Sequence, residues 1–81
     1  MSVVKYPLAT EKSVRFIDEQ NKIVFVVKRE ASKPQIKEDI EAMLKTKVKS
    51  INTLMAPDGN KRAYIEFTTP AIDIATNLGL M

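Results

Sequence analysis

The stretch of sequence that decides the fold is KIVFVVKREASKPQIKEDIEAMLK, residues 22–45. Its first part, residues 22–28, places five apolar residues between two lysines. Most of the five are β-branched, and successive residues of a strand point to opposite faces of a sheet. Because both faces of this segment are apolar, it predicts an interior strand that is covered, or nearly covered, on both sides.

The second part of the stretch predicts a helix over about residues 33–45. Ser32 and Gln35 have the spacing of a capping box, and Pro34 is tolerated in a first helical turn. The apolar residues that follow are spaced i, i+4, i+7 and i+8, which indicates one buried stripe. We expect this stripe, with its methionine as core filler, to contain Ile36, Ile40, Met43 and Leu44.

The next segments predict an antiparallel hairpin. Residues 48–55 and 62–67 have strand-like sequences, and Pro57-Asp58-Gly59 between them favours a tight turn. The second strand alternates apolar and polar residues, so one set should face the core. The expected core set is Ala63, Ile65 and Phe67, and the opposite set is Arg62, Tyr64 and Glu66.

The N-terminal segment predicts a short strand and a helix. Residues 3–5 are typical of a strand, which we expect Pro7 to break. Thr10 is a candidate N-cap for a helix over about 11–20, with Val14 and Ile17 facing inward.

The C-terminal segment predicts a last helix that starts at Thr69-Pro70 and stops near Gly79. Its expected inward stripe is Ile72, Ala75 and Leu78. The order of elements is therefore β-α-β-α-β-β-α in a single domain, residues 1–81. Such an order implies an α+β fold with an antiparallel or mixed sheet packed with helices.

Composition excludes many function classes. The 81 residues are 44% hydrophobic and 28% charged, as in one globular domain. The absence of Cys and His excludes zinc fingers, Ser-His-Asp and cysteine hydrolases, and disulfide scaffolds. Two glycines provide neither a P-loop nor a dinucleotide fingerprint. With no apolar run near the ~18–20 residues of a membrane span and no signal-peptide pattern, we expect a cytosolic protein without metal, cofactor or small-molecule substrate.

Acidic residues give no convincing catalytic site. Carboxylates cluster at Asp18-Glu19 and at Glu38, Asp39 and Glu41. Catalytic carboxylates need burial or a charged neighbour, whereas these are expected on polar, solvated helix faces. A small phosphatase would need an arginine-lined anion site, and the three arginines lie far apart in sequence. We therefore rank an enzyme third, behind the RNA-binding and protein-binding interpretations that follow.

A net charge of +3 is by itself weak support for a polyanion partner, but local clusters of basic residues could bind one. Lysine neutralises phosphates, Asn and Thr bond to sugars or bases, and an exposed Tyr stacks. One expected cluster surrounds the start of the middle helix and contains Lys28, Arg29, Lys33 and Lys37. Another is expected on the outward face of the hairpin and contains Lys49, Asn52, Thr53, Lys61, Arg62 and Tyr64. The alternative is an ordinary solvated strand face whose lysines protect an edge.

Five segments, taken in order, strongly resemble ribosomal protein 23 of the large subunit, over essentially the whole chain. The segments are PLATEK (7–12), NKIVFVV (21–27), ASKPQIK (31–37), VKSINTL (48–54) and KRAYI (61–65). Many bacterial members carry a long basic extension between the hairpin strands, and here the connection is only residues 56–61. In this respect the chain is similar to the short archaeal form.

This resemblance implies a four-stranded antiparallel sheet and a structural, non-catalytic role in the cytoplasmic ribosome. It implies binding to 23S ribosomal RNA beside the outer mouth of the polypeptide exit tunnel. The implied protein partners are the neighbouring large-subunit protein 29, the signal recognition particle and other exit-site factors.

Site residues follow from matching positions. Glu11 matches the exposed acidic position at which exit-site factors dock. The positions implied to contact RNA are Lys5, Lys12, Lys33, Lys37, Asn52, Thr53, Lys61, Arg62 and Tyr64. The competing hypothesis is a small ferredoxin-like protein-binding or regulatory module that binds no RNA.

Overall fold

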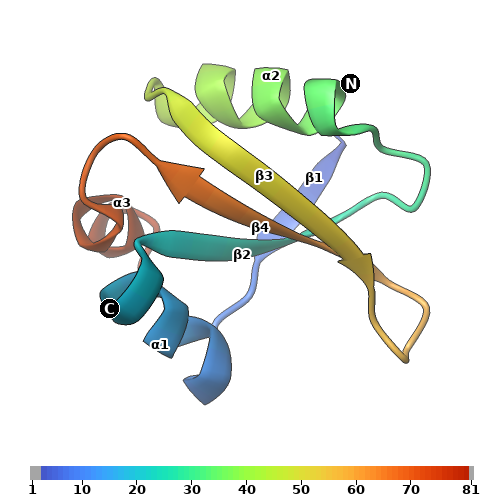
Figure 1. Cartoon of the computed structure of the whole chain (residues 1–81), viewed down its shortest axis with the longest axis horizontal. Helices are drawn as coiled ribbons and strands as arrows, with labels where there is room; N and C mark the ends of the chain where they lie inside the picture. Colours follow the sequence, from blue (N-terminus) through green and yellow to red (C-terminus); the bar gives the residue numbers. More distant parts are fainter. Residues whose placement is uncertain (1–2, 81) are drawn as a thin grey trace.

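The computed structural model describes residues 3–80, and these form an α+β fold in the order β-α-β-α-β-β-α that the sequence predicts (Figure 1). Residues 1, 2 and 81 of the expected domain lie outside this description. The strands are β1 (Val4–Pro7), β2 (Lys22–Val27), β3 (Val48–Met55) and β4 (Lys61–Phe67). The helices are α1 (Glu11–Gln20), α2 (Lys33–Leu44) and α3 (Ala71–Asn77).

The four strands form one sheet in the order β1-β2-β4-β3, and every neighbouring pair is antiparallel. The expectation of an antiparallel sheet is confirmed. β2 lies between β1 and β4, and its apolar residues from 23 to 27 are all buried. Ile23, Phe25 and Val27 belong to the helix-covered core, and Val24 and Val26 are buried on the opposite face. β1 ends at Pro7, where the sequence predicts a break, and this proline is tolerated as the last residue of an edge strand.

All three helices cover the same face of the sheet. Ile17 of α1, Ile40 of α2 and Ile74 of α3 belong to one hydrophobic core with Phe25 and Ile65 of the central strands. The expected alternation in β4 is confirmed, since Ala63, Ile65 and Phe67 are buried there. We call the other side of the sheet the open face, because no helix contributes core residues to it.

The helix caps match the sequence signals. The Thr10 hydroxyl accepts from the Ser13 N–H at 3.1 Å, and the Ser13 hydroxyl accepts from the Thr10 N–H at 2.8 Å. The capping box of Ser32 and Gln35 at the start of α2 is also formed. At the end of α3, Gly79 has φ +78°, a conformation that glycine adopts without a steric penalty.

Two helical stripes differ from the expected ones. Met43 is 50% exposed, so its assignment as core filler is wrong. The side of α2 that packs on the core carries Ile36 and Ile40, with Leu44 partly buried against it. Ile72 is 45% exposed, so its assignment to the inward stripe is wrong. Pro70 is the N-cap and α3 begins one residue later. The side of α3 that docks on the core carries Ala71, Ile74 and Ala75.

Two carboxylates expected to be solvated instead hold strand ends. Oδ2 of Asp39 accepts from the N–H groups of Val3 and Val4 at 2.8 and 3.1 Å. Oε2 of Glu41 accepts from the Val48 N–H at 3.0 Å. Helix α2 is thereby attached to the first residues of both edge strands, which fixes how it crosses the sheet.

The turn between β3 and β4 is short and closed by its own hydrogen bonds. The Ala56 N–H donates to the Asn60 carbonyl at 2.8 Å, and Gly59 adopts φ +87°. The Asn60 N–H donates to Oδ1 of Asp58 at 3.1 Å, and this bond holds the pKa of the Asp58 carboxyl below its ordinary value. The tight turn expected from Pro57-Asp58-Gly59 is therefore confirmed.

Candidate nucleic-acid interface

The open face is built by strand alternation. Arg62, Tyr64 and Glu66 of β4 point away from the helices, because their neighbours in sequence fill the core. Their register partners on the two flanking strands share this face. These partners are Ser50, Asn52 and Leu54 of β3, and Lys22, Val24 and Val26 of β2.

Helix α1 adds a second aromatic ring to the open face. Phe16 and Tyr64 form a T-shaped pair with ring centroids 5.4 Å apart and an interplanar angle of 79°. The next residue, Ile17, is buried in the core on the other side of the sheet. Helix α1 therefore lies at one end of the sheet, where consecutive side chains reach both faces (Figure 1).

A small polar hollow lies where α1 meets the open face. Its volume is about 70 Å³, and it is bounded by the side chains of Lys12, Phe16, Arg62 and Tyr64 above Val24. Among residues 3–80, neither Lys12 nor Arg62 forms an ion pair. Besides the hydrogen bond from Asn60, Arg62 interacts electrostatically with the Asp58 carboxylate and helps to lower its pKa. Neither cation is held in an ion pair within this part of the chain, so both can meet an anion.

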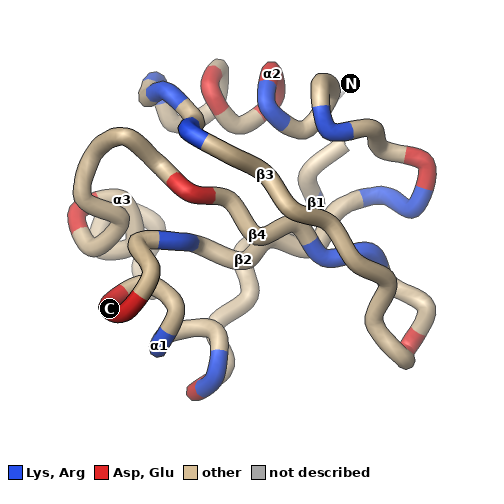
Figure 2. Tube along the Cα trace, viewed as in Figure 1, with Lys and Arg blue, Asp and Glu red and all other residues tan. Residues whose placement is uncertain are grey.

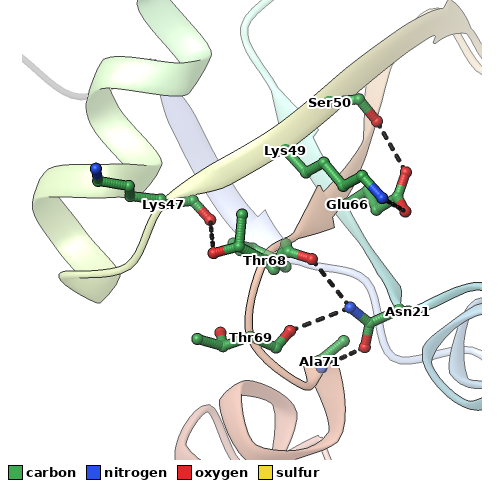
Figure 3. Close-up of polar contacts among 9 residues, drawn as sticks. Asn21, Lys47, Lys49, Ser50, Glu66, Thr68, Thr69 and Ala71 are labelled. Atoms are coloured by element: carbon green, nitrogen blue, oxygen red, sulfur yellow. Dashed lines mark hydrogen bonds and ion pairs between the residues drawn. The ribbon is translucent and has the colours of Figure 1, made fainter.

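The open face carries one acidic residue, Glu66, and groups of the neighbouring strand β3 offset its negative charge. Oε2 of Glu66 lies 3.6 Å from Nζ of Lys49, and its Oε1 accepts from the Ser50 hydroxyl at 3.1 Å (Figure 3). Its negative charge therefore repels a polyanion less than an unpaired carboxylate would.

A second basic surface lies at the β3 edge of the sheet. Lys33 and Lys37 of α2 and Lys49 of β3 line a groove of about 380 Å³, with Pro34 and Ile51 among the other lining residues. Figure 2 shows the basic positions of α2 facing those at the start of β3. We call this surface the three-lysine groove.

The hairpin residues expected on one outward face are divided between two faces. Asn52, Arg62 and Tyr64 lie on the open face, whereas Thr53 and Lys61 point to the side that the helices cover. The expectation of a common face is wrong for Thr53 and Lys61, because successive strand residues alternate. Nζ of Lys61 donates to the Ala31 carbonyl at 2.6 Å, so this cation has a structural partner.

Lys5 and Glu11 stand apart from the other candidate residues. Lys5 is exposed on edge strand β1, at the irregular step between Val4 and Tyr6. Glu11 is exposed in the first turn of α1, one residue before Lys12. Neither residue lines the polar hollow or the three-lysine groove.

The sequence reasoning missed Phe16. Val14 and Ile17 already accounted for the amphipathic stripe of α1, so nothing assigned this ring to the opposite face. A signal was present, because Phe16 follows Lys12 by four residues and shares a helix face with it. Within residues 3–80 no cluster of three acidic side chains has metal-binding geometry, and no helix there is long and apolar enough to span a membrane.

The fold and this surface define the class of small α+β proteins in which helices cover one face of a sheet and the other face is basic and aromatic. The family model described as ribosomal protein L23 matches residues 2–73. The chain therefore belongs to the ribosomal protein L23 family.

Individual relatives agree with this assignment. Over 80 residues the chain is 38% identical to large ribosomal subunit protein uL23 of Methanococcus aeolicus, covering 96% of the chain and 93% of that protein. Identity to the Pyrobaculum aerophilum protein of the same name is 38% over 81 residues, 98% of the chain and 100% of the relative. For the Tetrahymena thermophila protein it is 42% over 82 residues, 99% of the chain but 55% of the relative.

Family membership confirms a structural protein of the large ribosomal subunit rather than an enzyme. It also assigns the chain to the ribosome in the cytoplasm.

Proposed function

We propose that this chain binds 23S ribosomal RNA near the polypeptide exit tunnel through the open face and the three-lysine groove. The observation that carries the proposal is the open face itself, on which unpaired Lys12 and Arg62 lie beside the aromatic rings of Phe16 and Tyr64. Cations neutralise phosphates, and aromatic rings stack on unpaired bases. Both rings are half-buried, so each keeps part of its surface accessible.

Affinity and specificity are expected to come from different contacts with the RNA. Each phosphate neutralised by lysine or arginine releases counterions and adds affinity without sequence preference. Specificity then comes from the folded shape of the RNA and from bases that reach the aromatic rings. A net charge of +3 suits a protein that contacts RNA on some surfaces and leaves others free for protein partners.

A salt titration tests this proposal. Purified protein is titrated with its own large-subunit RNA and with a length-matched unrelated RNA at several salt concentrations. We expect tighter binding to the ribosomal RNA and a plot of log K against log[salt] with a negative slope. Equal, weak binding to both RNAs would contradict the proposal and favour a module that binds protein alone.

Two neighbouring residues of β4 provide a matched pair of variants. Arg62→Gln removes an open-face cation, so the salt slope should fall by about 0.7–0.9 in magnitude. Lys61→Gln should leave the slope unchanged, because this side chain points to the helix side and donates to the Ala31 carbonyl. If both changes reduced the slope equally, the side of the sheet to which a β4 cation points would not decide whether it contacts RNA, and the proposed role of the open face would be contradicted.

We also propose that Glu11 is a docking point for exit-site factors such as the signal recognition particle, beside large-subunit protein 29. Its support is an exposed carboxylate at the start of α1 that forms no ion pair with the other described residues. Glu11→Ala should weaken recruitment of the particle to ribosomes without releasing the protein from them. Glu38→Ala, an exposed acid on α2, is the control, and equal recruitment by both variants would contradict the docking role.

A further inference from the structure

Phe16 separates two hollows of different character. On one side is the polar hollow of about 70 Å³ with Lys12, Arg62 and Tyr64. On the other side is a hollow of about 140 Å³ along α1, lined by Lys12, Arg15, Phe16 and Glu19. Phe16 and Lys12 line both hollows, so the two adjoin at these side chains and share a single aromatic ring.

We propose that this pair of hollows binds one unstacked nucleotide of an RNA strand, with its phosphate in the polar hollow and its base against Phe16. We call it the nucleotide site. This inference rests on the proposed RNA-binding function and assigns to it a particular place on the protein.

The polar hollow suits a phosphate. Its rim carries the cations Lys12 and Arg62, which form no ion pair among residues 3–80, and the phenol of Tyr64. A guanidinium offers two parallel N–H donors to phosphate oxygens, and an ammonium adds a compact positive charge. No carboxylate lines this hollow to oppose an anion.

The larger hollow suits a base. It offers the Phe16 ring as a stacking partner, and stacking on an aromatic side chain accepts any base. Arg15 and Glu19 lie at its border, with Nε of Arg15 3.7 Å from Oε1 of Glu19. Both side chains are mostly exposed, so their ion pair is weak and opens at little cost.

Glu19 gives this site a base preference. A carboxylate accepts hydrogen bonds from exocyclic amino groups, as it does from N4 of cytosine. Uracil has no exocyclic amino group, and its single ring donor, N3–H, lies between two carbonyl oxygens that a carboxylate repels. The site should therefore favour cytosine, adenine or guanine over uracil.

An acidic peptide is the competing occupant. It would use Lys12 and Arg62 through its carboxylates, but the Glu19 carboxylate beside the Phe16 ring would repel them. The joint presence of a cationic hollow, an aromatic ring and a carboxylate at its border favours a nucleotide.

The test uses the full chain and single-stranded RNA hexamers carrying one 2-aminopurine, whose fluorescence reports stacking. Phe16→Leu should weaken hexamer binding about 5- to 100-fold and abolish the fluorescence change, while the salt slope stays the same. Phe16→Trp should retain binding. Met55→Ala changes an exposed apolar residue that lines neither hollow and pairs with Lys61, on the side of the sheet away from the open face, so binding should change less than twofold.

Further variants separate the two halves of the site. Lys12→Gln should lower the salt slope and leave the fluorescence change of the bound hexamer, because it removes a phosphate contact only. Glu19→Gln should remove the preference of oligocytidine over oligouridine. Circular dichroism and thermal melting of each variant confirm that it is folded.

The outcomes distinguish this site from the proposed function. If ribosomal RNA binds preferentially but Phe16→Leu behaves like Met55→Ala, the nucleotide site is wrong and the proposed function stands. If hexamers behave as expected but ribosomal RNA has no advantage over the control RNA, the proposed function is wrong. Binding of an acidic peptide that competes with hexamers and is insensitive to Phe16→Leu would overturn the nucleotide site in favour of a protein partner.

Discussion

Asn21 is the residue on which the most distant parts of the chain depend. It adopts φ +56° at the end of α1 and forms three hydrogen bonds with the segment that precedes α3 (Figure 3). Its Nδ2 donates to the carbonyls of Phe67 and Thr69 at 3.0 and 3.1 Å. Its Oδ1 accepts from the Ala71 N–H at 2.6 Å. One side chain thus joins two helices and the end of β4.

Replacing Asn21 should destabilise the protein through these bonds rather than through the backbone. Asn21→Gly tolerates a positive φ and loses all three hydrogen bonds, which should cost about 2–3 kcal/mol of unfolding free energy. Lys45→Gly is the matched control, because Lys45 has φ +52° at the end of α2. That change should be neutral or stabilising by about 0.5–1 kcal/mol. Urea unfolding measures both, and equal shifts would contradict the role of the Asn21 amide.

Helix α2 acts as a brace between the two edges of the sheet. Its Asp39 binds the first residues of β1, and its Glu41 binds the first residue of β3. Hydrogen bonds to a charged acceptor are stronger than those between neutral groups. The attachment of β1 should therefore depend on Asp39 more than on the apolar contacts of this short strand.

Asp39→Ala should cost about 2–3 kcal/mol of unfolding free energy and speed amide exchange in β1, because it leaves two N–H groups without their carboxylate acceptor. Hydrogen exchange and urea unfolding measure these effects. Glu38→Ala changes the neighbouring exposed acid and should alter stability by less than about 0.5 kcal/mol. Unchanged exchange at Val3 and Val4 in Asp39→Ala would contradict the brace.

The elements themselves were predictable because their signals are local. The capping boxes at Thr10 and Ser32 and the alternation in β4 each depend on residues only a few positions apart. The features that the sequence did not predict depend on contacts between residues far apart in the chain. The bond from Ala71 to Asn21 spans 50 residues, and the exposure of Ile72 follows from how α3 is docked rather than from its own spacing.

The candidate site was predicted in part. Six of the nine implied RNA contacts lie on the open face, at its α1 border or in the three-lysine groove: Lys12, Lys33, Lys37, Asn52, Arg62 and Tyr64. The sequence predicts Thr53 and Lys61 on the same face as their neighbours, but strand alternation places both on the helix side of the sheet. Phe16 was missed because a sequence does not show that a helix reaches around the end of a sheet.

The whole molecule presents two basic surfaces that share no side chain. The polar hollow uses Lys12 and Arg62, and the three-lysine groove uses Lys33, Lys37 and Lys49. An RNA that contacts both surfaces at once would gain affinity from each independently, because separated sites contribute additively.

Arg62→Gln and Lys37→Gln should therefore be additive in log K for ribosomal RNA. Each change should reduce the magnitude of the salt slope by about 0.7–0.9, and the double variant by about twice as much. Fluorescence anisotropy at several salt concentrations measures the slopes. If the double variant were no weaker than Arg62→Gln alone, the groove would not contact the same RNA.

The turn between β3 and β4 has a consequence for how the chain can change over evolutionary time. Met55 and Lys61 still pair in the ladder, and the Ala56 N–H closes the connection directly beyond them. The strand register is complete before the turn begins, so inserted residues would leave the core untouched. Each doubling of a flexible loop costs only about 0.6 kcal/mol. Descendants of such a chain can acquire a long arm at this point, with new reach, at almost no loss of foldability.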